Sequence, residues 1–439
     1  MQDSSSTNRG TNLDPWYGAY AARTAGLSAS EVRALFAVAS RPEVVSLAGG
    51  MPFVAALPED LIRSAFDTVM RTQGPMALQY GSGQGVPALR EHILEVMAEE
   101  GIRAGVDDVV TTTGSQQAID LVAKLFLDPG DVVLAEAPSY VGAIGVFRSY
   151  QARTVHVAMD SDGLIPQALR ETIAAERAAG STIKFLYTVP NFHNPAGVTM
   201  SAARRPEILE IARSNGILVV EDNPYGLLWF DKAPPPPLRT LEDDGVIYLG
   251  SFSKTLAPGF RVGWVLAPHA IREKLVLAAE SAILSPSSFN QLVVNEYLNT
   301  ADWRAQIDVF RGVYRERKET MLSALSEHLP ELTWTNPNGG FYVWVTLPPE
   351  LDSKQMLPRA VTELVAYTPG TAFYADGGGR SEMRLSFCYP TPENIRMGIR
   401  RLATVVGGEL DLLRTFSGTG TLRVNRPDRR VVSPPPDLG

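Results

Sequence analysis

Apolar positions in the middle of the chain fall into short runs separated by polar turns. From about residue 108 to residue 268 these runs are rich in Val, Ile and Leu. Continuous apolar character of this kind is typical of strands buried on both faces, as in a parallel sheet between helices. The segment SQQAIDLVAKLF, by contrast, has apolar residues at helical spacing and predicts a helix. The pattern predicts six strands, within residues 108–114, 131–140, 183–190, 216–222, 245–251 and 261–268.

The two ends of the chain show a different pattern. Near the N-terminus, SASEVRALFAVAS predicts a short amphipathic helix, VVSLAGGMP predicts an extended segment, and a further helix opens at Pro58. After about residue 310, the long charged helix VYRERKETMLSALSEHL precedes two strands, FYVWVTLP and MRLSFCYP. We therefore expect an α/β fold. It combines a large domain, whose mostly parallel central sheet lies between helices, with a smaller α+β domain formed from both chain ends.

The same pattern sets the expected limits of the domains. Residues 1–24 are a polar N-terminal extension, and residues 416–439 are a tail with too little apolar content to fold alone. We expect that tail to be disordered. Between these ends we expect an N-terminal arm that joins the small domain, then the large domain, then the C-terminal small domain, at residues 25–57, 58–305 and 306–415.

Composition and charge narrow the range of functions. The chain has 439 residues, 45% of them hydrophobic and 20% charged, which suits a globular protein with a large core. Its net charge of −8 argues against a nucleic-acid partner, because phosphate backbones require a basic face. The single cysteine, Cys388, excludes an intrachain disulfide and suits a reducing cytoplasm. Without zinc-ligand spacing, a signal peptide or a membrane-length apolar stretch, we expect no metal, no membrane partner and a cytoplasmic location.

The segment SFSKTLAPGFRVGW contains a lysine in an unusual setting. Lys254 lies between a buried strand and an apolar stretch, with Ser251 and Ser253 before it and Arg261 after it. A surface lysine in a capped turn would explain the S-x-S-K alone. A phosphate-bearing aldehyde cofactor explains all four residues: the lysine forms a Schiff base, its pKa lowered by a desolvated site. The serines and the arginine then bind the phosphate.

A carboxylate ends one of the predicted buried strands. In GILVVEDNPYG, Asp222 falls at the sheet edge where ligands bind in open α/β folds. A carboxylate there would pair with the protonated nitrogen of a pyridine ring and keep the ring electron-accepting. Tyr225, three residues further on, would hydrogen-bond the phenolic oxygen of that ring. An aspartate that merely caps a turn is the alternative.

Two other strand ends offer groups suited to such a ligand. In TTTGSQQAIDL, the N–H groups of Ser115 and Gln116 open a helix whose dipole favours phosphate, although many strand–turn–helix units look alike. In PSY, Tyr140 would stack on the cofactor ring, or else it belongs to the core.

Further polar residues complete the candidate site. In the turn-rich loop YTVPNFHNPAG, we expect Asn194 to face the cofactor oxygen and His193 to be an exposed, non-catalytic residue. In EMRLSFC, Arg384 is flanked by apolar residues, and a buried arginine requires an anionic partner. A substrate α-carboxylate would supply that partner, and a structural carboxylate is the alternative.

These segments occur in a recognisable order. They are SLAGGMP, LQYGSGQG, TTGSQQAIDL, NFHNPAG, VVEDNPYG and SFSKTLAPGFRVGW, with MRLSF closing the set. From about residue 25 to residue 405 the chain resembles the fold-type I aminotransferases of class I/II, which depend on pyridoxal 5′-phosphate (PLP). Within them it most resembles the branch of 2-aminoadipate and kynurenine aminotransferases.

The resemblance implies a role for each matching residue. Lys254 matches the Schiff-base lysine, which also moves a proton between the substrate Cα and the cofactor C4′. Tyr80 matches a tyrosine that reaches the active site of the neighbouring subunit, which implies a homodimer with shared sites. The other matches are Asp222 for the pyridine nitrogen, Asn194 and Tyr225 for the ring oxygen, Ser115, Gln116, Ser251, Ser253 and Arg261 for the phosphate, Tyr140 for stacking, Arg384 for the substrate α-carboxylate, and Gly50 for a backbone approach to substrate.

The implied activity is a ping-pong exchange of an amino group between an L-amino acid and a 2-oxo acid such as 2-oxoglutarate. Arg33 matches a position that binds the side-chain carboxylate of acidic substrates, with a solvated arginine as the alternative. The apolar GLLWF after Tyr225 favours large or aromatic side chains. A PLP-dependent lyase, decarboxylase or cyclase is the nearest other reading, since the fold hosts several chemistries. A PLP-binding regulator would require a DNA-binding head, and about two dozen polar residues before the arm are too few.

Overall fold

The computed structural model describes residues 14–27 and 41–416 of the chain. A central sheet of eight strands runs in the order β2-β9-β8-β7-β6-β3-β4-β5. Neighbours from β8 to β4 are parallel, whereas β9 is antiparallel to both β2 and β8, and β5 is antiparallel to β4. The strands are β2 (Val109–Thr112), β3 (Val132–Ala137), β4 (Arg153–Asp160), β5 (Gly163–Leu164), β6 (Ile183–Thr188), β7 (Leu218–Asp222), β8 (Val246–Ser251) and β9 (Gly263–Leu266).

All six strands predicted for the central sheet are present, and two further strands of that sheet, β4 and β5, were not predicted. Every residue of β2, β8 and β9 is buried, which explains their unbroken apolar character. Strand β4 lies next to the sheet edge, and only one of its eight residues is fully buried. Its sequence RTVHVAMD is therefore mixed, and it lacks the apolar run by which the other strands were found.

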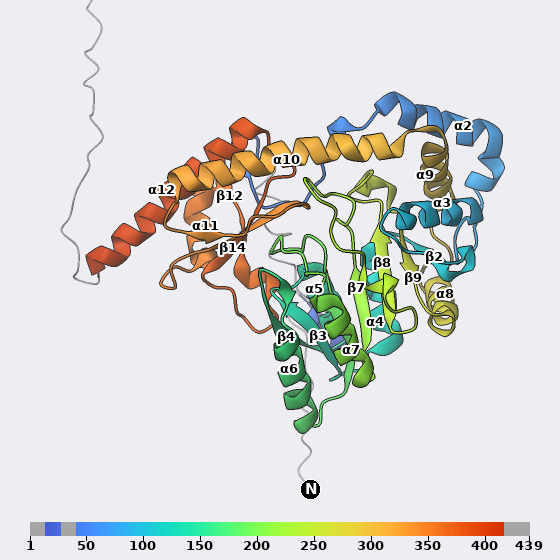
Figure 1. Cartoon of the computed structure of the whole chain (residues 1–439), viewed down its shortest axis with the longest axis horizontal. Helices are drawn as coiled ribbons and strands as arrows, with labels where there is room; N and C mark the ends of the chain where they lie inside the picture. The colour runs from blue at the N-terminus through green and yellow to red at the C-terminus, as the bar shows by residue number, and fades with distance from the viewer. Residues whose placement is uncertain (1–13, 28–40, 417–439) are drawn as a thin grey trace, which may run out of the picture.

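Helices cover both faces of the central sheet. On one face α4 (Ser115–Phe126), α5 (Val141–Ser149) and α8 (His269–Ile283) enclose an apolar cluster. On the other face α6 (Pro166–Ala178) and α7 (Arg204–Ser214) enclose a second cluster. Beyond the β2 edge lie α2 (Glu59–Ala77), α3 (Pro87–Ala98) and α9 (Ser288–Thr300) (Figure 1). The predicted helix at residues 115–126 is α4, and the helix expected to open at Pro58 is α2.

The smaller domain contains a four-stranded sheet in the order β10-β11-β14-β13. Strand β1 (Val45–Ser46) pairs in parallel with β12 (Val365–Ala366), so the N-terminal part of the chain joins the C-terminal part, as expected. The helix α10 (Trp303–His328) runs along both domains in Figure 1. The remaining elements are β10 (Thr333–Trp334), β11 (Tyr342–Thr346), α11 (Ser353–Thr362), β13 (Thr368–Pro369), β14 (Glu382–Ser386) and α12 (Pro392–Phe416).

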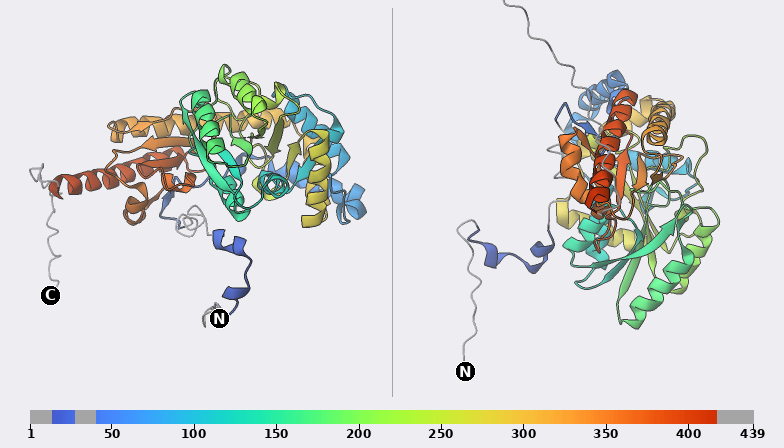
Figure 2. Two further views of the ribbon diagram at one scale, coloured as in Figure 1. Left: turned by 90° about the horizontal axis from the view of Figure 1, so that it is seen from below. Right: turned by 90° about the vertical axis from the view of Figure 1, so that its left-hand side faces the viewer.

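Several expectations concern the limits of the chain. The charged helix predicted after residue 310 begins earlier, at Trp303, so the expected domain boundary at 305/306 falls within its first turn. The short 3-10 helix at Ala22–Gly26 contacts α5, and Figure 2 shows this part of the chain (dark blue) at the edge of the molecule. The amphipathic helix predicted around Arg33 lies outside the described residues, as does the tail beyond Phe416. Within residues 14–27 and 41–416, no helix is both long and apolar enough to cross a membrane.

Candidate active site

A cavity of about 390 Å³ lies where the carboxyl ends of the parallel strands meet the small domain. In open α/β sheets this is the edge at which ligands bind. Of the predicted site residues that the structure describes, all line it except Gln116, Arg261 and Tyr80. The lining comprises Gly50, Met51, Pro52, Ser115, Tyr140, Val141, Gly142, Val189, Asn194, Asp222, Pro224, Tyr225, Ser251, Ser253, Lys254, Pro258, Tyr342 and Arg384.

Lys254 lies three residues beyond the end of β8 and lines the cavity. Its Nζ donates a hydrogen bond to the carbonyl of Gly50 (2.9 Å) and lies 5.6 Å from the ring centre of Phe341. Burial lowers the pKa of the Lys254 amine to about 8, and the nearby guanidinium groups of Arg384 and Arg261 act in the same direction. An amine with this pKa is roughly one-tenth neutral at pH 7, several hundred times more than a lysine of ordinary pKa, so it is prepared to act as a nucleophile or a base.

Asp222 is the last residue of β7 and is 3% exposed. Its Oδ2 accepts a hydrogen bond from the Tyr187 hydroxyl (2.7 Å), while Oδ1 has no hydrogen-bond partner among the described residues. Burial raises the pKa of this carboxyl to about 6, and the Tyr187 bond opposes the rise. Because an unpaired buried oxygen is costly, Oδ1 fits a ligand that brings its own donor, such as a protonated pyridine nitrogen.

The turn between β2 and α4 brings an arginine close to a helix N-terminus. Arg261 donates through Nη2 to the carbonyl of Thr113 (2.9 Å). Gly114 has φ +80°, and a Cβ there would lie only 2.5 Å from Arg261 Nη2, so this packing requires glycine. The guanidinium and the first N–H groups of α4, from Ser115 onward, together form an anion site. At the end of β8, Ser251 Oγ lies 2.9 Å from Ser253 Oγ.

Gln116 differs from its neighbours in the way its side chain is used. Its Oε1 accepts a hydrogen bond from the Tyr140 hydroxyl (3.1 Å), and its Nε2 donates to the carbonyl of Gly142 (3.0 Å). The side chain therefore fixes the orientation of Tyr140, and only the backbone N–H of Gln116 remains for an anion. Tyr140 lines the cavity, so it is not solely a core residue.

Arg384 is buried on β14 without an acidic partner. Nη1 donates to Asn194 Oδ1 (2.9 Å) and Nη2 to the carbonyl of Ala48 (2.6 Å), while Nε has no partner among the described residues. The guanidinium carbon lies 4.2 Å from the ring centre of Tyr342. None of the ion pairs between described residues involves Arg384, so the alternative of a structural carboxylate is not supported. A buried guanidinium with neutral partners alone fits a ligand carboxylate.

Tyr342 is a lining residue that the sequence analysis missed. Its hydroxyl lies 3.4 Å from that of Tyr225, and a Cβ at Gly50 would lie 1.9 Å from it, so only glycine fits at position 50. Tyr342 occurs in FYVWV, which was recognised only as a strand. Nothing in that pattern shows that the tyrosine faces a cavity, because this depends on how the small sheet packs against the large domain.

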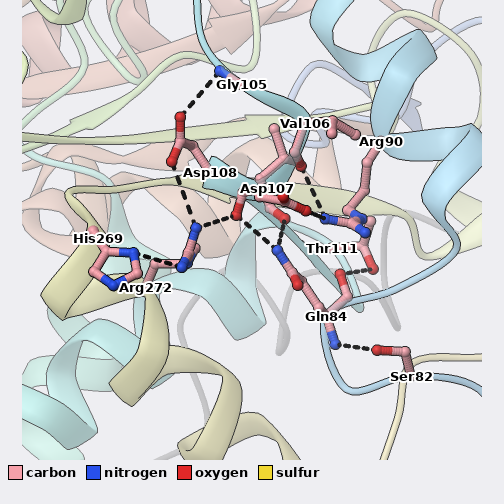
Figure 3. A network of polar contacts seen from close by, with 11 residues as sticks. Ser82, Gln84, Arg90, Gly105, Val106, Asp107, Asp108, Thr111, His269 and Arg272 are labelled. Atoms are coloured by element: carbon pink, nitrogen blue, oxygen red, sulfur yellow. Dashed lines mark hydrogen bonds and ion pairs between the residues drawn. The ribbon is translucent and has the colours of Figure 1, made fainter.

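Two residues lie apart from the cavity. Tyr80 is 78% exposed, on a loop whose base is held by the polar network of Figure 3. There Gln84 Nε2 donates to the carbonyls of Asp107 (2.8 Å) and Val109 (3.1 Å). His193, expected to be exposed, is instead 1% exposed, with Nε2 3.0 Å from Glu136 Oε2. That expectation was wrong because the loop is covered by both domains. Arg33 lies outside the described residues.

Fold and cavity together define a PLP-dependent enzyme of fold type I, since a partly buried lysine of lowered pKa, a carboxylate oxygen without a partner and an anion site converge at one sheet edge. Residues 44–402 match the model for "Aminotransferase class I and II", and the chain belongs to that family. No group of His, Cys, Asp and Glu in the described parts of the chain is arranged to hold a metal ion.

Individual relatives agree with this assignment. The chain is 40% identical to aromatic-amino-acid aminotransferase 1 of Thermococcus litoralis, over 89% of this chain and 94% of that protein. It is 39% identical to 2-aminoadipate transaminase of Thermus thermophilus, over 91% and 99%. The solved structure of kynurenine aminotransferase from Pyrococcus horikoshii, in complex with pyridoxamine phosphate (PMP), superposes on this structure with a TM-score of 0.85. The two sequences are 40% identical, over 89% of this chain and 97% of that chain. The chain is therefore a PLP-dependent aminotransferase, as its motifs predicted.

Proposed function

We propose that the protein transfers the amino group of a large, aromatic or 2-aminoadipate-like L-amino acid to a 2-oxo acid such as 2-oxoglutarate, by a ping-pong mechanism. The observation that carries this proposal is the cavity itself. It combines a lysine with a lowered pKa, a carboxylate with one unpaired oxygen and a buried arginine that lacks an acidic partner. Each of these groups is costly in an empty protein interior, and each is satisfied by one part of PLP or of an amino acid.

The bound cofactor supplies an electron-accepting ring that stabilises negative charge developing at the substrate Cα. Lys254 holds the cofactor aldehyde in the resting enzyme, and its amine then moves the proton between the substrate Cα and the cofactor C4′. A pKa of about 8 favours both directions of this transfer near neutral pH. Asp222 holds the proton on the pyridine nitrogen, and Arg384 binds the substrate α-carboxylate.

The other predicted residues position the two ligands. Asn194 and Tyr225 hold the ring oxygen, Tyr140 stacks on the ring, and the Gly50 backbone approaches the substrate. Because Asn194 also accepts a hydrogen bond from Arg384, it links the cofactor end of the cavity to the substrate end. The phosphate is bound by Ser115, the backbone of Gln116, Ser251, Ser253 and Arg261.

Apolar side chains form part of the cavity wall. Met51, Pro52, Val141 and Pro258 line the cavity and carry no charge. This lining supports large or aromatic side chains, in line with the names of the aromatic-amino-acid and kynurenine aminotransferases. An acidic side chain such as that of 2-aminoadipate requires a further cation, which we assign to Arg33.

A panel of amino donors against 2-oxoglutarate tests the proposed activity. Aromatic donors and 2-aminoadipate are expected to yield glutamate at kcat/KM values at least about tenfold above those of alanine, since each additional buried methylene contributes about 0.8 kcal/mol. Arg33→Ala is expected to lower the rate with 2-aminoadipate and to leave the rate with phenylalanine unchanged. Release of CO2 or ammonia without formation of glutamate would instead indicate a lyase or decarboxylase.

We also propose that the protein is a cytoplasmic homodimer whose two active sites each receive Tyr80 from the other subunit. The exposure of Tyr80 supports this, since its side chain projects from the molecule rather than into its own cavity. Apolar side chains nearby are also exposed: Leu78 is 74% exposed, Met76 53% and Leu284 56%. An apolar surface of this kind is typical of a subunit interface.

Mixing two impaired variants tests the shared site. Tyr80→Ala is expected to lower activity by about tenfold or more, because it removes the cofactor contact that the neighbouring subunit supplies, and a lost hydrogen bond of this kind costs about 1.5 kcal/mol. Lys254→Ala is expected to be inactive. In a hybrid dimer one site contains an intact Lys254 and an intact Tyr80, so random exchange of subunits should restore about a quarter of the wild-type activity. If mixing gives only the average of the two variants, each site takes all its residues from one subunit.

A further inference from the structure

The orientation of Asp222 depends on a single side chain. Among the described residues, only the Tyr187 hydroxyl donates to its carboxylate, with 2.7 Å from Oη to Oδ2. Tyr187 lies on β6 and Asp222 on the neighbouring parallel strand β7, where Tyr187 pairs with Val220. Residues two apart on a strand face the same side, so Val220 and Asp222 share the face from which Tyr187 projects.

The position of the Tyr187 hydroxyl is fixed by the packing of its ring, which solvent does not reach. Tyr187 is 0% exposed, and its ring packs edge-on against Phe147 of α5, with 5.6 Å between ring centres and 73° between planes. The ring belongs to the apolar cluster between the sheet and helices α4, α5 and α8. An aromatic ring held in this way keeps its hydroxyl at one point, and the carboxylate that accepts from it is held with it.

We propose that Tyr187 is a positioning residue for cofactor binding: its hydroxyl holds Asp222 Oδ2, so that Oδ1 points to the pyridine nitrogen and the carboxylate stays ionised. The inference rests on the role of Asp222 given in the proposed function. Tyr187 does not itself line the cavity, whereas Asp222 does, so the tyrosine acts only through the carboxylate. The chain therefore uses a neutral donor on the adjacent strand to complete the hydrogen bonding of the ring-binding acid.

The electrostatics of the pair agree with this role. Burial raises the pKa of Asp222 to about 6, while the Tyr187 bond and the charge of Lys254 lower it. Tyr140 also faces the carboxylate, and Glu136 lies near the tyrosine. Only ionised Asp222 pairs with a pyridinium, so cofactor affinity is present above the Asp222 pKa and is lost as pH falls through it. Loss of the Tyr187 donor raises that pKa, and the loss of affinity then begins at higher pH.

The test compares Tyr187→Phe with the wild type in the full-length protein after removal of the cofactor. The probe is pyridoxamine phosphate, which has no aldehyde and so does not react with Lys254. Its dissociation constant is measured from acid to alkaline pH by the quenching of protein fluorescence. The variant is expected to bind about tenfold or more weakly near neutral pH, with its loss of affinity on acidification displaced to higher pH. Equal affinity and an unchanged pH profile overturn the inference.

Two comparisons separate positioning from a general loss of stability. Tyr367→Phe removes another buried hydroxyl bond, to the carbonyl of Ser353 (2.6 Å) in the small domain, and should leave the affinity unchanged. A cofactor analogue whose ring lacks the nitrogen should bind Tyr187→Phe and wild type equally well. If the variant weakens this analogue as much as pyridoxamine phosphate, Tyr187 is merely structural and the inference fails.

Asp222→Asn distinguishes failure of the inference from failure of the proposed function. If Asp222→Asn weakens binding of pyridoxamine phosphate and Tyr187→Phe does not, the role of Tyr187 is wrong while that of Asp222 stands. If Asp222→Asn binds as well as the wild type, the role of Asp222 is itself wrong, and the inference falls with it. The expected result is that both variants weaken binding, with the larger effect in Asp222→Asn.

Discussion

Replacing Lys254 with alanine is expected to lower transamination by about 10⁴-fold or more, the upper range for loss of a general acid–base group. The change removes both the covalent anchor of the cofactor and the amine that moves the proton at Cα. Initial rates of glutamate formation measure the loss, and the absorbance of lysine-bound PLP is expected to disappear with it. The fold should persist, because the amine makes one hydrogen bond, to the carbonyl of Gly50.

Two controls make the Lys254 result specific. Lys274→Ala removes an exposed lysine on α8 and should leave both activity and absorbance unchanged. The thermal unfolding midpoint of cofactor-free Lys254→Ala should match that of cofactor-free wild type, which excludes misfolding. A Lys254→Ala protein with full turnover would show that the site has been assigned to the wrong lysine.

Replacing Arg384 with alanine is expected to raise KM for every amino acid by roughly 10- to 150-fold, with a smaller effect on kcat. The variant loses a charge-assisted contact of about 1.5–3 kcal/mol to the α-carboxylate, which all these substrates share. It also removes the bond that holds Asn194 Oδ1. Steady-state kinetics with several donors measure the change, and a rise restricted to one donor would indicate a side-chain contact instead.

The Arg384 result requires a control for the loss of a buried guanidinium. Arg239→Ala offers one: Arg239 is 8% exposed and donates to the carbonyl of Val246, at the opposite end of β8 from the cavity. It should lower the unfolding midpoint and leave KM unchanged. Arg384→Lys should recover only part of the affinity, because an ammonium cannot bind a carboxylate through two parallel hydrogen bonds. Unchanged KM in Arg384→Ala would mean that the arginine is structural.

Those parts of the fold and site that depend on local pattern were predictable from sequence. Asp222 ends a buried strand, and Lys254 follows another, so strand recognition alone placed both at one sheet edge. The missed strand β4 shows the limit of this approach. It lies next to the sheet edge and contains both exposed and buried residues, so its sequence has no apolar run that would indicate a strand.

Contacts between distant segments were not predictable. Arg384 meets Asn194 and the carbonyl of Ala48, which are 190 and 336 residues away along the chain. Tyr187 was assigned to a strand correctly, yet its bond to Asp222 depends on strand order and on the face from which it projects. The exposure predicted for His193 was wrong for the same reason, because both domains cover its loop and bury it although the loop sequence is polar. These features follow from tertiary packing, which a single sequence does not encode locally.

The most direct test of the central claim is to locate the cofactor on the chain. Purified protein is treated with borohydride, which fixes the bond between PLP and the lysine that carries it, and the peptides are then identified by mass spectrometry. We predict that the added mass falls on Lys254, at about one cofactor per chain, and that prior incubation with a donor amino acid removes it. Addition at any other lysine, or full activity in protein with no addition at Lys254, would contradict the account.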